Sequence, residues 1–250
     1  MKRLSRRFPT SFLRLFRHIM NIFFPRTCAG CRGDIPAEAE SVVCVDCWDA
    51  LPRWNGLSCI VCGLPLPDGG ARCRDCRRAR RAFRFLRSAG VYEGSLGRMI
   101  RTFKYEGRED LAEPFARLLA ELWEGEPRLA PVDAVVPVPL HWIRERLRGY
   151  NQAAVLARAF GRETGLPVLE SALKRRKATK SQTELRRGER QENVKDAFDA
   201  RRSEELRGKT ILLVDDVCTT GATLEACARA LKKGGARRVG ALTVARQVPF

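Results

Sequence analysis

Eight of the ten cysteines form four CxxC pairs in the N-terminal third of this 250-residue chain. They are Cys28, Cys31, Cys44, Cys47, Cys59, Cys62, Cys73 and Cys76. A CxxC turn lets two thiolates reach the same metal ion, and two such turns complete a closed tetrahedral zinc site. We therefore expect two structural zinc ions and a module that unfolds without them. The spacing favours two sequential ribbons and leaves open a cross-braced pairing of the first turn with the third.

The cysteine pattern also bears on the compartment. A secreted disulfide scaffold would rarely space all eight cysteines as CxxC. The apolar stretch at 12–24 is interrupted by Arg14, Arg17 and His18, and no small-residue cleavage site follows it. No apolar run reaches the roughly 18–20 residues that a transmembrane segment needs. We predict a cytoplasmic protein whose thiolates bind metal.

The chain is strongly basic, with 47 Lys+Arg against 29 Asp+Glu and a net charge of +18, which favours anionic partners. Residues 1–26 predict a basic amphipathic helix that docks on the protein or contacts a membrane surface or DNA. The basic stretch 72–108 contains Phe83, Phe85 and Tyr92. These aromatic residues are either a stacking platform for single-stranded DNA or part of the core.

From about Ser88 onward, apolar strands alternate with helices. The expected strands are 89–92, 133–139, 168–173, 210–217 and 239–246, and the expected helices are 95–105, 110–123, 143–163 and 222–233. This alternation predicts an α/β fold, a parallel sheet with helices on both faces. Asp110 is expected to cap the second helix. We predict three parts: the helix 1–26, a double zinc ribbon at 27–77, and an α/β domain at 88–250 with a mobile loop at about 174–196.

The most informative segment is 211–223, ILLVDDVCTTGAT. A buried strand delivers Asp215 and Asp216 at its carboxyl end, and a small, hydroxyl-rich loop with Gly221 then opens a helix. In open α/β sheets ligands bind at that edge, and such a loop can hold a phosphate at a helix N-terminus. The GKT at 208–210 is not a Walker A motif, because it precedes a strand and Ser203 stands where that motif needs glycine.

Segment 211–223 resembles the phosphoribosyl pyrophosphate signature of type I phosphoribosyltransferases. Together with the cysteine module, the segments 99–105, 137–140, 148–152 and 193–198 resemble the ComF family. The resemblance implies that Asp215 and Asp216 hold the ribose hydroxyls. It also implies a 5′-phosphate loop and a pyrophosphate loop. The residues of these loops are Thr219, Thr220, Gly221, Ala222 and Thr223 for the first, and Pro139 and Leu140 for the second.

Phosphoribosyl transfer displaces pyrophosphate from the ribose, with Mg²⁺ and cationic side chains stabilising the leaving group. We expect Arg148, beside Arg144 and Arg146, to serve this role, and Lys177 and Lys180 to belong to a closing loop. Purine-type transferases usually carry an acidic residue at the position of Thr219. Its absence here means that either the nucleophile is already reactive or the site binds its ligand without transfer.

ComF relatives are associated with DNA uptake during natural transformation. We therefore expect a protein that binds phosphoribosyl pyrophosphate with Mg²⁺ and is linked to DNA uptake, with pentosyl transfer left open. The alternative is a non-catalytic competence factor that binds single-stranded DNA. Its further partners would be other competence proteins.

Overall fold

The computed structural model describes residues 26–36, 38–39, 41–126, 131–176, 196–201 and 204–248. The chain divides into two compact units, Met1–Ala50 and Leu51–Phe250. The division falls inside the cysteine module predicted at 27–77, so each unit contains one pair of CxxC turns. The helix predicted within 1–26 and the loop residues Lys177 and Lys180 lie outside the described residues.

The first unit is organised by tight turns. A turn between Thr27 and Asp34, which form an antiparallel bridge, contains the first CxxC pair. The second pair opens α2 (Val45–Asp49), whose N-cap residue is Cys44. The sequence carried no helical periodicity here, because a five-residue helix is too short to show one.

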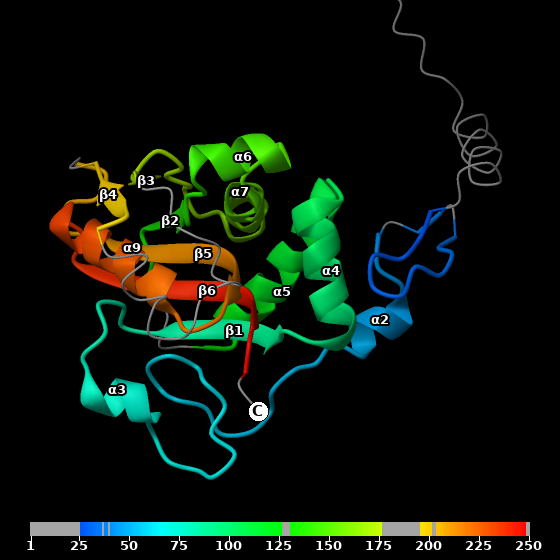
Figure 1. Cartoon of the computed structure of the whole chain (residues 1–250), viewed down its shortest axis with the longest axis horizontal. Coiled ribbons are helices and arrows are strands. Elements are labelled where there is room, and N and C mark those ends of the chain that lie inside the picture. The colour runs from blue at the N-terminus through cyan, green and yellow to red at the C-terminus, as the bar shows by residue number, and fades with distance from the viewer. Residues whose placement is uncertain are drawn as a thin grey trace, which may run out of the picture. The chain divides into compact units, whose positions relative to one another are not determined.

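The second unit is built on a four-stranded sheet (Figure 1). Its strands lie in the order β1 (Leu86–Val91), β6 (Arg238–Arg246), β5 (Thr210–Cys218) and β2 (Ala134–Pro137), and all neighbours are parallel. The first five residues of β5 are all buried. A strand covered on both faces is a continuous apolar run, and this pattern confirms the predicted parallel sheet.

Helices cover both faces of the sheet. They are α4 (Gly94–Tyr105), α5 (Ala112–Glu124), α7 (Gln152–Thr164) and α9 (Ala222–Lys233), whereas α6 (Trp142–Arg148) has no buried residue. In Figure 1, α9 lies on one face, where it contacts β5 and β6, while α5 and α7 pack against each other on the other. Among the described residues, no helix has both the length and the apolar character needed to cross a membrane.

Three predicted elements differ in the structure. The single helix expected at 143–163 is wrong, because Gly149, at φ 87°, ends α6 and Asn151 caps α7. Asp110 does not cap a helix: it lies in the 3₁₀ turn η1 (Glu109–Leu111) and accepts from Arg108.

The strand expected at 168–173 is also different. Val168 forms only a single bridge with Val135, and the next strand, β3 (Leu173–Arg175), pairs antiparallel with β4 (Phe198–Ala200) outside the main sheet.

Phe83 and Phe85 of the basic stretch 72–108 belong to the core, whereas Tyr92 is half-buried and Tyr105 is exposed. Phe83 and Phe85 are only 2% and 5% exposed. The Phe85 ring lies directly on Gly240 of β6, where an added Cβ would come within 2.1 Å of the ring. A stacking platform built on these two rings, one of the two readings of the sequence, is therefore wrong.

The second pair of CxxC turns is part of this unit. It includes α3 (Arg74–Arg78), for which Cys73 is the N-cap residue. The four cysteines share a buried cluster with residues of β1, β5 and α9. The second ribbon thus packs on the α/β core.

Candidate functional site

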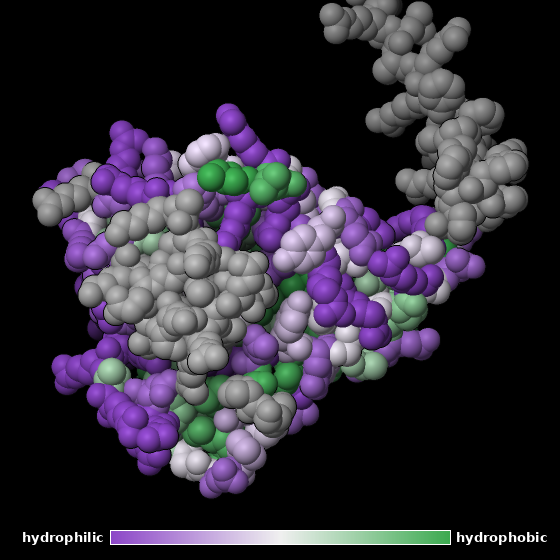
Figure 2. Space-filling model, viewed as in Figure 1, coloured by the Kyte–Doolittle hydropathy of each residue, from purple (hydrophilic) through white to green (hydrophobic). Residues whose placement is uncertain are grey.

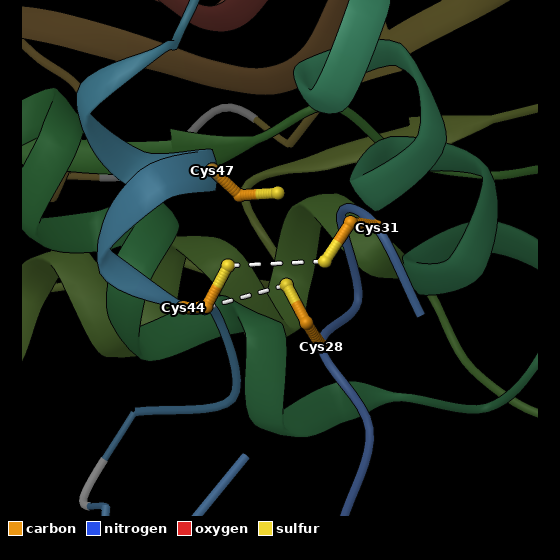
Figure 3. A group of neighbouring side chains, drawn as sticks. All are labelled: Cys28, Cys31, Cys44 and Cys47. Atoms are coloured by element: carbon orange, nitrogen blue, oxygen red, sulfur yellow. Dashed lines mark hydrogen bonds between the residues drawn. The ribbon is translucent and has the colours of Figure 1, made fainter. Parts of the chain in front are cut away.

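The first cysteine cluster consists of Cys28, Cys31, Cys44 and Cys47, whose Sγ atoms all lie within 4.8 Å of one another. Figure 3 shows the four side chains turned toward a common centre, two from the turn and two from the start of α2. A tetrahedron with Zn–S bonds of about 2.3 Å separates its sulfurs by about 3.8 Å. The Sγ atoms of Cys31 and Cys44 are 3.8 Å apart. These residues fit a structural zinc ion.

Backbone N–H groups surround the sulfurs of this cluster. Gly30 and Cys44 each donate to the Cys28 Sγ at 3.3 Å. Burial alone would raise the pKa of Cys28, but the backbone donors outweigh it and lower that pKa to about 6. At least one ligand is therefore a thiolate at neutral pH.

The second cysteine cluster consists of Cys59, Cys62, Cys73 and Cys76, with all four Sγ atoms again within 4.8 Å. All four residues are buried, and the Sγ atoms of Cys62 and Cys73 are 3.6 Å apart. The structure therefore confirms the sequential pairing, first turn with second and third with fourth, and not the cross-braced one.

A different kind of site lies at the carboxyl end of β5. Asp215 and Asp216 follow its apolar run, and Asp216 is 6% exposed. Successive residues of a strand point to opposite faces, so the two carboxylates serve the two sides of the sheet edge. The Asp215 carboxylate accepts from the N–H of Asp216 at 2.9 Å.

Lys104 reaches this edge from the last turn of α4. Its Nζ lies 2.8 Å from Oδ1 of Asp216, and the two side chains are only 18% and 9% exposed. Burial would lower the pKa of Lys104, but the Asp216 carboxylate outweighs it and raises that pKa above its ordinary value. The sequence places Lys104 in the motif 99–105 but predicts no role for it.

The charges at this edge act on Asp215. Burial and the neighbouring Asp216 raise the pKa of Asp215 to about 7, while Lys104 and Arg175 act in the opposite direction. Arg175 comes from β3, and its own pKa is lowered by burial and by the nearby Arg144. The edge thus combines two carboxylates with several cations, an arrangement typical of functional sites.

The loop after β5 has the geometry expected of a phosphate cradle. Gly221 adopts the left-handed conformation at φ 79° and is the N-cap residue of α9. The Thr220 hydroxyl accepts from the Ala222 N–H at 3.4 Å. Thr219 and Thr223 are half-buried beside them. The N–H groups at the start of a helix of this length favour an anion.

The pyrophosphate-loop residues follow β2, the neighbour of β5. Val138 donates to the Val214 carbonyl at 3.0 Å, so the chain stays paired to β5 just before Pro139 and Leu140, which are half-buried. The carboxyl ends of β2 and β5 therefore meet at one edge of the sheet.

Arg148 is held by two neighbours. Its guanidinium donates to Gln152 at 2.7 Å and lies over the Tyr105 ring at 4.9 Å. Tyr150 donates to the carbonyl of Phe103, and Asn151 donates to the carbonyl of Val138. The motif 148–152 thus ties the end of α4, and with it Lys104, to the end of β2.

The sequence predicts no role for His141, but the structure shows that this residue is the N-cap of α6. It is buried, and its Nδ1 accepts from the Ile143 N–H at 3.4 Å. The signal was weak because histidine is uncommon at that position.

Comparison with known proteins gives two family matches. A model described as "Double zinc ribbon domain" matches residues 19–77, and one described as "Phosphoribosyl transferase domain" matches residues 147–248. "Competence protein F" of Haemophilus influenzae is 31% identical over 228 residues, covering 90% of this chain and 98% of that protein. The chain belongs to the ComF family.

Other ComF-family relatives match over similar lengths. "Competence protein ComFC" of Bacillus subtilis is 30% identical over 222 residues, covering 84% of this chain and 86% of that protein. "DNA utilization protein YhgH" of Escherichia coli K12 is 30% identical over 218 residues, covering 86% of this chain and 94% of that protein.

In this ComF-family chain the phosphoribosyltransferase sheet begins ahead of the matched domain, because β1 and β2 precede residue 147. Both cysteine clusters lie within the matched ribbon, residues 19–77. The family match and the sulfur geometry thus support structural zinc independently.

Proposed function

We propose that the carboxyl edge of β2 and β5 binds phosphoribosyl pyrophosphate together with Mg²⁺. The observation that carries the proposal is the pair Asp215 and Asp216 placed directly before a left-handed glycine loop at the start of α9. Carboxylates repel phosphate but accept hydrogen bonds from sugar hydroxyls, whereas the loop N–H groups suit the 5′-phosphate. One ligand that needs both is a phosphorylated ribose.

Magnesium fits this edge through its ligand chemistry. Mg²⁺ prefers carboxylate oxygens and substrate phosphates and keeps several waters. Asp215 and Asp216 supply the oxygens, and the bound ion would offset the charge of the pyrophosphate. Arg148, Pro139 and Leu140 are proposed to contact that pyrophosphate, with Lys177 and Lys180 closing over it.

Isothermal titration with phosphoribosyl pyrophosphate and Mg²⁺ tests the proposal. The wild type should bind, and Asp215→Asn with Asp216→Asn should lose binding while keeping the far-ultraviolet circular dichroism. Glu170→Gln is a matched control, because this exposed carboxylate pairs with Arg158 away from the sheet edge. Equal affinity of the wild type and the double variant would refute the assignment.

Whether the bound ligand reacts is a separate question. In a transfer, a nitrogen nucleophile forms a bond to the ribose anomeric carbon, the bond to pyrophosphate breaks, and the nucleophile loses a proton. Thr219 offers no carboxylate to take that proton. We therefore propose that any acceptor is a nitrogen that is basic and reactive by itself. An assay of pyrophosphate release with candidate amines measures this. If no amine causes release, the site binds its ligand without transfer.

A second proposal concerns single-stranded DNA, and two relatives carry the names "Competence protein F" and "DNA utilization protein YhgH". Trp142 and Tyr105 are 57% and 69% exposed, and each carries a stacked arginine: Arg146 lies over Trp142 at 5.5 Å and Arg148 over Tyr105. Figure 2 shows apolar side chains gathered over α6 at the surface. Exposed aromatic rings beside arginines are the elements that stack bases and neutralise phosphates.

Fluorescence anisotropy with a labelled single-stranded oligonucleotide tests this second role. Trp142→Ala should weaken binding about fivefold or more, since stacking one base contributes roughly 1–3 kcal/mol. Trp54→Ala, at another exposed tryptophan, is the control. Affinity should fall steeply with salt. An affinity that changes neither in Trp142→Ala nor with salt would exclude this surface.

We place both proposed roles, ligand binding and DNA binding, in the cytoplasm, where thiols stay reduced.

A further inference from the structure

The second cysteine cluster and the phosphate-binding loop are joined by buried contacts within one compact unit. We propose that metal binding at the second cysteine cluster and ligand binding at the phosphate loop are energetically coupled, with Arg246 as the positioning residue. This inference rests on the proposed function for its ligand. It predicts that the first cysteine cluster, in the other unit, has no such effect.

Arg246 is the most direct link. It ends β6, is only 5% exposed, and donates through Nη1 to the Cys62 carbonyl at 2.6 Å. The same Nη1 lies 3.5 Å from the Cys218 Sγ, and Nη2 lies 4.0 Å from the Cys62 Sγ. Cys218 pairs with Arg246 across the sheet and immediately precedes Thr219. One guanidinium therefore touches a metal-binding turn and the strand end from which the phosphate loop begins.

Leu86, the first residue of β1, provides a second link. Its N–H donates to the Val61 carbonyl, inside the third CxxC turn, at 2.8 Å. Its side chain lies against Gly221, where an added Cβ would be 3.8 Å away. Gly63 approaches so closely that a Cβ there would lie 2.7 Å from the Leu86 carbonyl oxygen. The third CxxC turn thus contacts the backbone of Leu86, and the phosphate-binding loop contacts its side chain.

Glu225, in the first turn of α9, provides a third link. Both of its carboxylate oxygens accept from the Ala82 N–H, at 3.1 and 2.9 Å. The preceding Arg81 pairs with Asp75 of α3 at 3.9 Å and interacts with the Cys76 sulfur. The helix whose N-terminus is proposed to hold the phosphate is therefore tied to the segment that leaves the second cluster.

The charges fit the same picture. Four thiolates on one divalent zinc leave a net negative charge. The guanidinium of the buried Arg246 and that of Arg81, whose side chain is 11% exposed, lie beside them. The Nε atoms of both arginines are buried and have no hydrogen-bond partner within the described part of the chain. A shift of the sulfurs should therefore shift Arg246, because a buried cation that loses its partners is left uncompensated, with no water to replace them. Its movement would displace Cys218 and the loop.

Coupling is reciprocal, so it can be read at the metal. The equilibrium transfer of zinc to a chromophoric chelator is measured in the Cys28→Ser/Cys31→Ser variant, which retains the second cluster, with and without phosphoribosyl pyrophosphate and Mg²⁺. The ligand should raise the zinc affinity of this cluster about fivefold or more, the lower end of typical coupling. In the matched Cys62→Ser/Cys76→Ser variant, the zinc affinity of the first cluster should not respond.

Arg246→Met separates positioning from mere structure. It should retain two zinc ions per chain, bind the ligand more weakly, and abolish the effect of the ligand on zinc affinity, with partial rescue by Arg246→Lys. An undiminished effect of the ligand on zinc affinity in Arg246→Met, or no effect of bound ligand in the protein that keeps Arg246, would overturn the inference. If Cys62→Ser/Cys76→Ser does not fold, the Arg246 variants and the first-cluster variant still decide it.

Failure of the proposed function is distinguished by calorimetry and by hydrogen exchange. No heat of binding in the wild type would reject the ligand. The coupling itself is then read without ligand, as amide exchange of residues 218–223 in Arg246→Met and in zinc-depleted protein. Faster exchange in both supports the link, and unchanged exchange in both rejects it.

Discussion

Asp215 is the residue whose ionisation should set the pH dependence of ligand binding. Its pKa is raised to about 7, and only the ionised carboxylate accepts from both ribose hydroxyls. Affinity for phosphoribosyl pyrophosphate should therefore rise as the pH increases through about 7, and Asp215→Asn should flatten the profile. Calorimetry between pH 6 and pH 8.5 measures this, with the ligand's own titration taken from Asp215→Asn. A profile identical in both proteins would contradict the assignment.

The same raised pKa has a consequence for stability. Because the folded-state pKa lies above the ordinary value of 3.8, the folded chain binds the proton more tightly than the unfolded chain. The contribution of Asp215 to stability is present below about pH 4 and is lost as the pH rises toward 7. Asp215→Asn should therefore raise the melting temperature at pH 8 and less so at pH 5. A variant that melts lower than the wild type at pH 8 would contradict this.

Lys104, which pairs with Asp216, should also affect the titration of Asp215. Lys104→Met removes a cation that lowers the pKa of Asp215, so the midpoint of the affinity profile should move to higher pH. Lys104→Arg keeps the charge and should shift the midpoint less. Calorimetric pH profiles of both variants test this, and an unchanged midpoint in Lys104→Met would show that Lys104 does not act on the site.

The pair formed by Lys104 and Asp216 marks a limit of sequence reasoning at this scale. The spacing and residue types at 211–223 were enough to predict the carboxylates and the loop. The partner of Asp216 was not predictable, since it depends on how α4 packs against the end of β5. A lysine that ends a helix is ordinarily a solvated charge, and only its burial reveals otherwise.

Among the elements, the left-handed turn at the start of α9 is the most specific. Gly221→Ala should cost about 1–2 kcal/mol, because an L-residue at positive φ is strained. Gly165→Ala is a matched control, since Gly165 has φ 73° at the end of α7. Both variants should melt lower, but only Gly221→Ala should lose ligand affinity at 25 °C. Equal affinities would show that the turn does not bind the ligand.

The strength of the sequence pattern decided which elements could be predicted. β5 and α9 were predicted almost to the residue, because a long apolar run followed by glycine leaves little choice. The break between α6 and α7 was missed. Gly149 is tolerated inside a helix by pattern alone, and the break is fixed by the tertiary bonds of Tyr150 and Asn151.

At the scale of the whole molecule, the two cysteine clusters should contribute differently to stability. The second cluster shares the buried core of the sheet, whereas the first lies in the separate unit. Cys62→Ser should therefore lower the main thermal transition by several degrees, and Cys28→Ser should leave it in place. Differential scanning calorimetry with zinc analysis measures both. A main transition that is insensitive to Cys62→Ser would contradict the shared core.

The net charge and the cysteine spacing predicted anionic partners and zinc binding, but they did not predict which side chains lie on the surface. The spacing favoured the sequential pairing of the clusters but left the cross-braced pairing open, and only the positions of the sulfurs decide between them. The burial of Phe83 and Phe85 could not be predicted, because basic neighbours suggested a surface while the missing side chain of Gly240 provides a buried place for the Phe85 ring. The exposed rings are Tyr105, which lies in the same basic stretch, and Trp142 of α6.

The most direct test is a crystal structure of the full chain grown with phosphoribosyl pyrophosphate and Mg²⁺. Density for the ligand should place the ribose hydroxyls within hydrogen-bond distance of Asp215 and Asp216. The 5′-phosphate should lie against the N–H groups of 219–223. Ligand bound elsewhere on the chain, or a ribose that contacts neither carboxylate, would contradict the account.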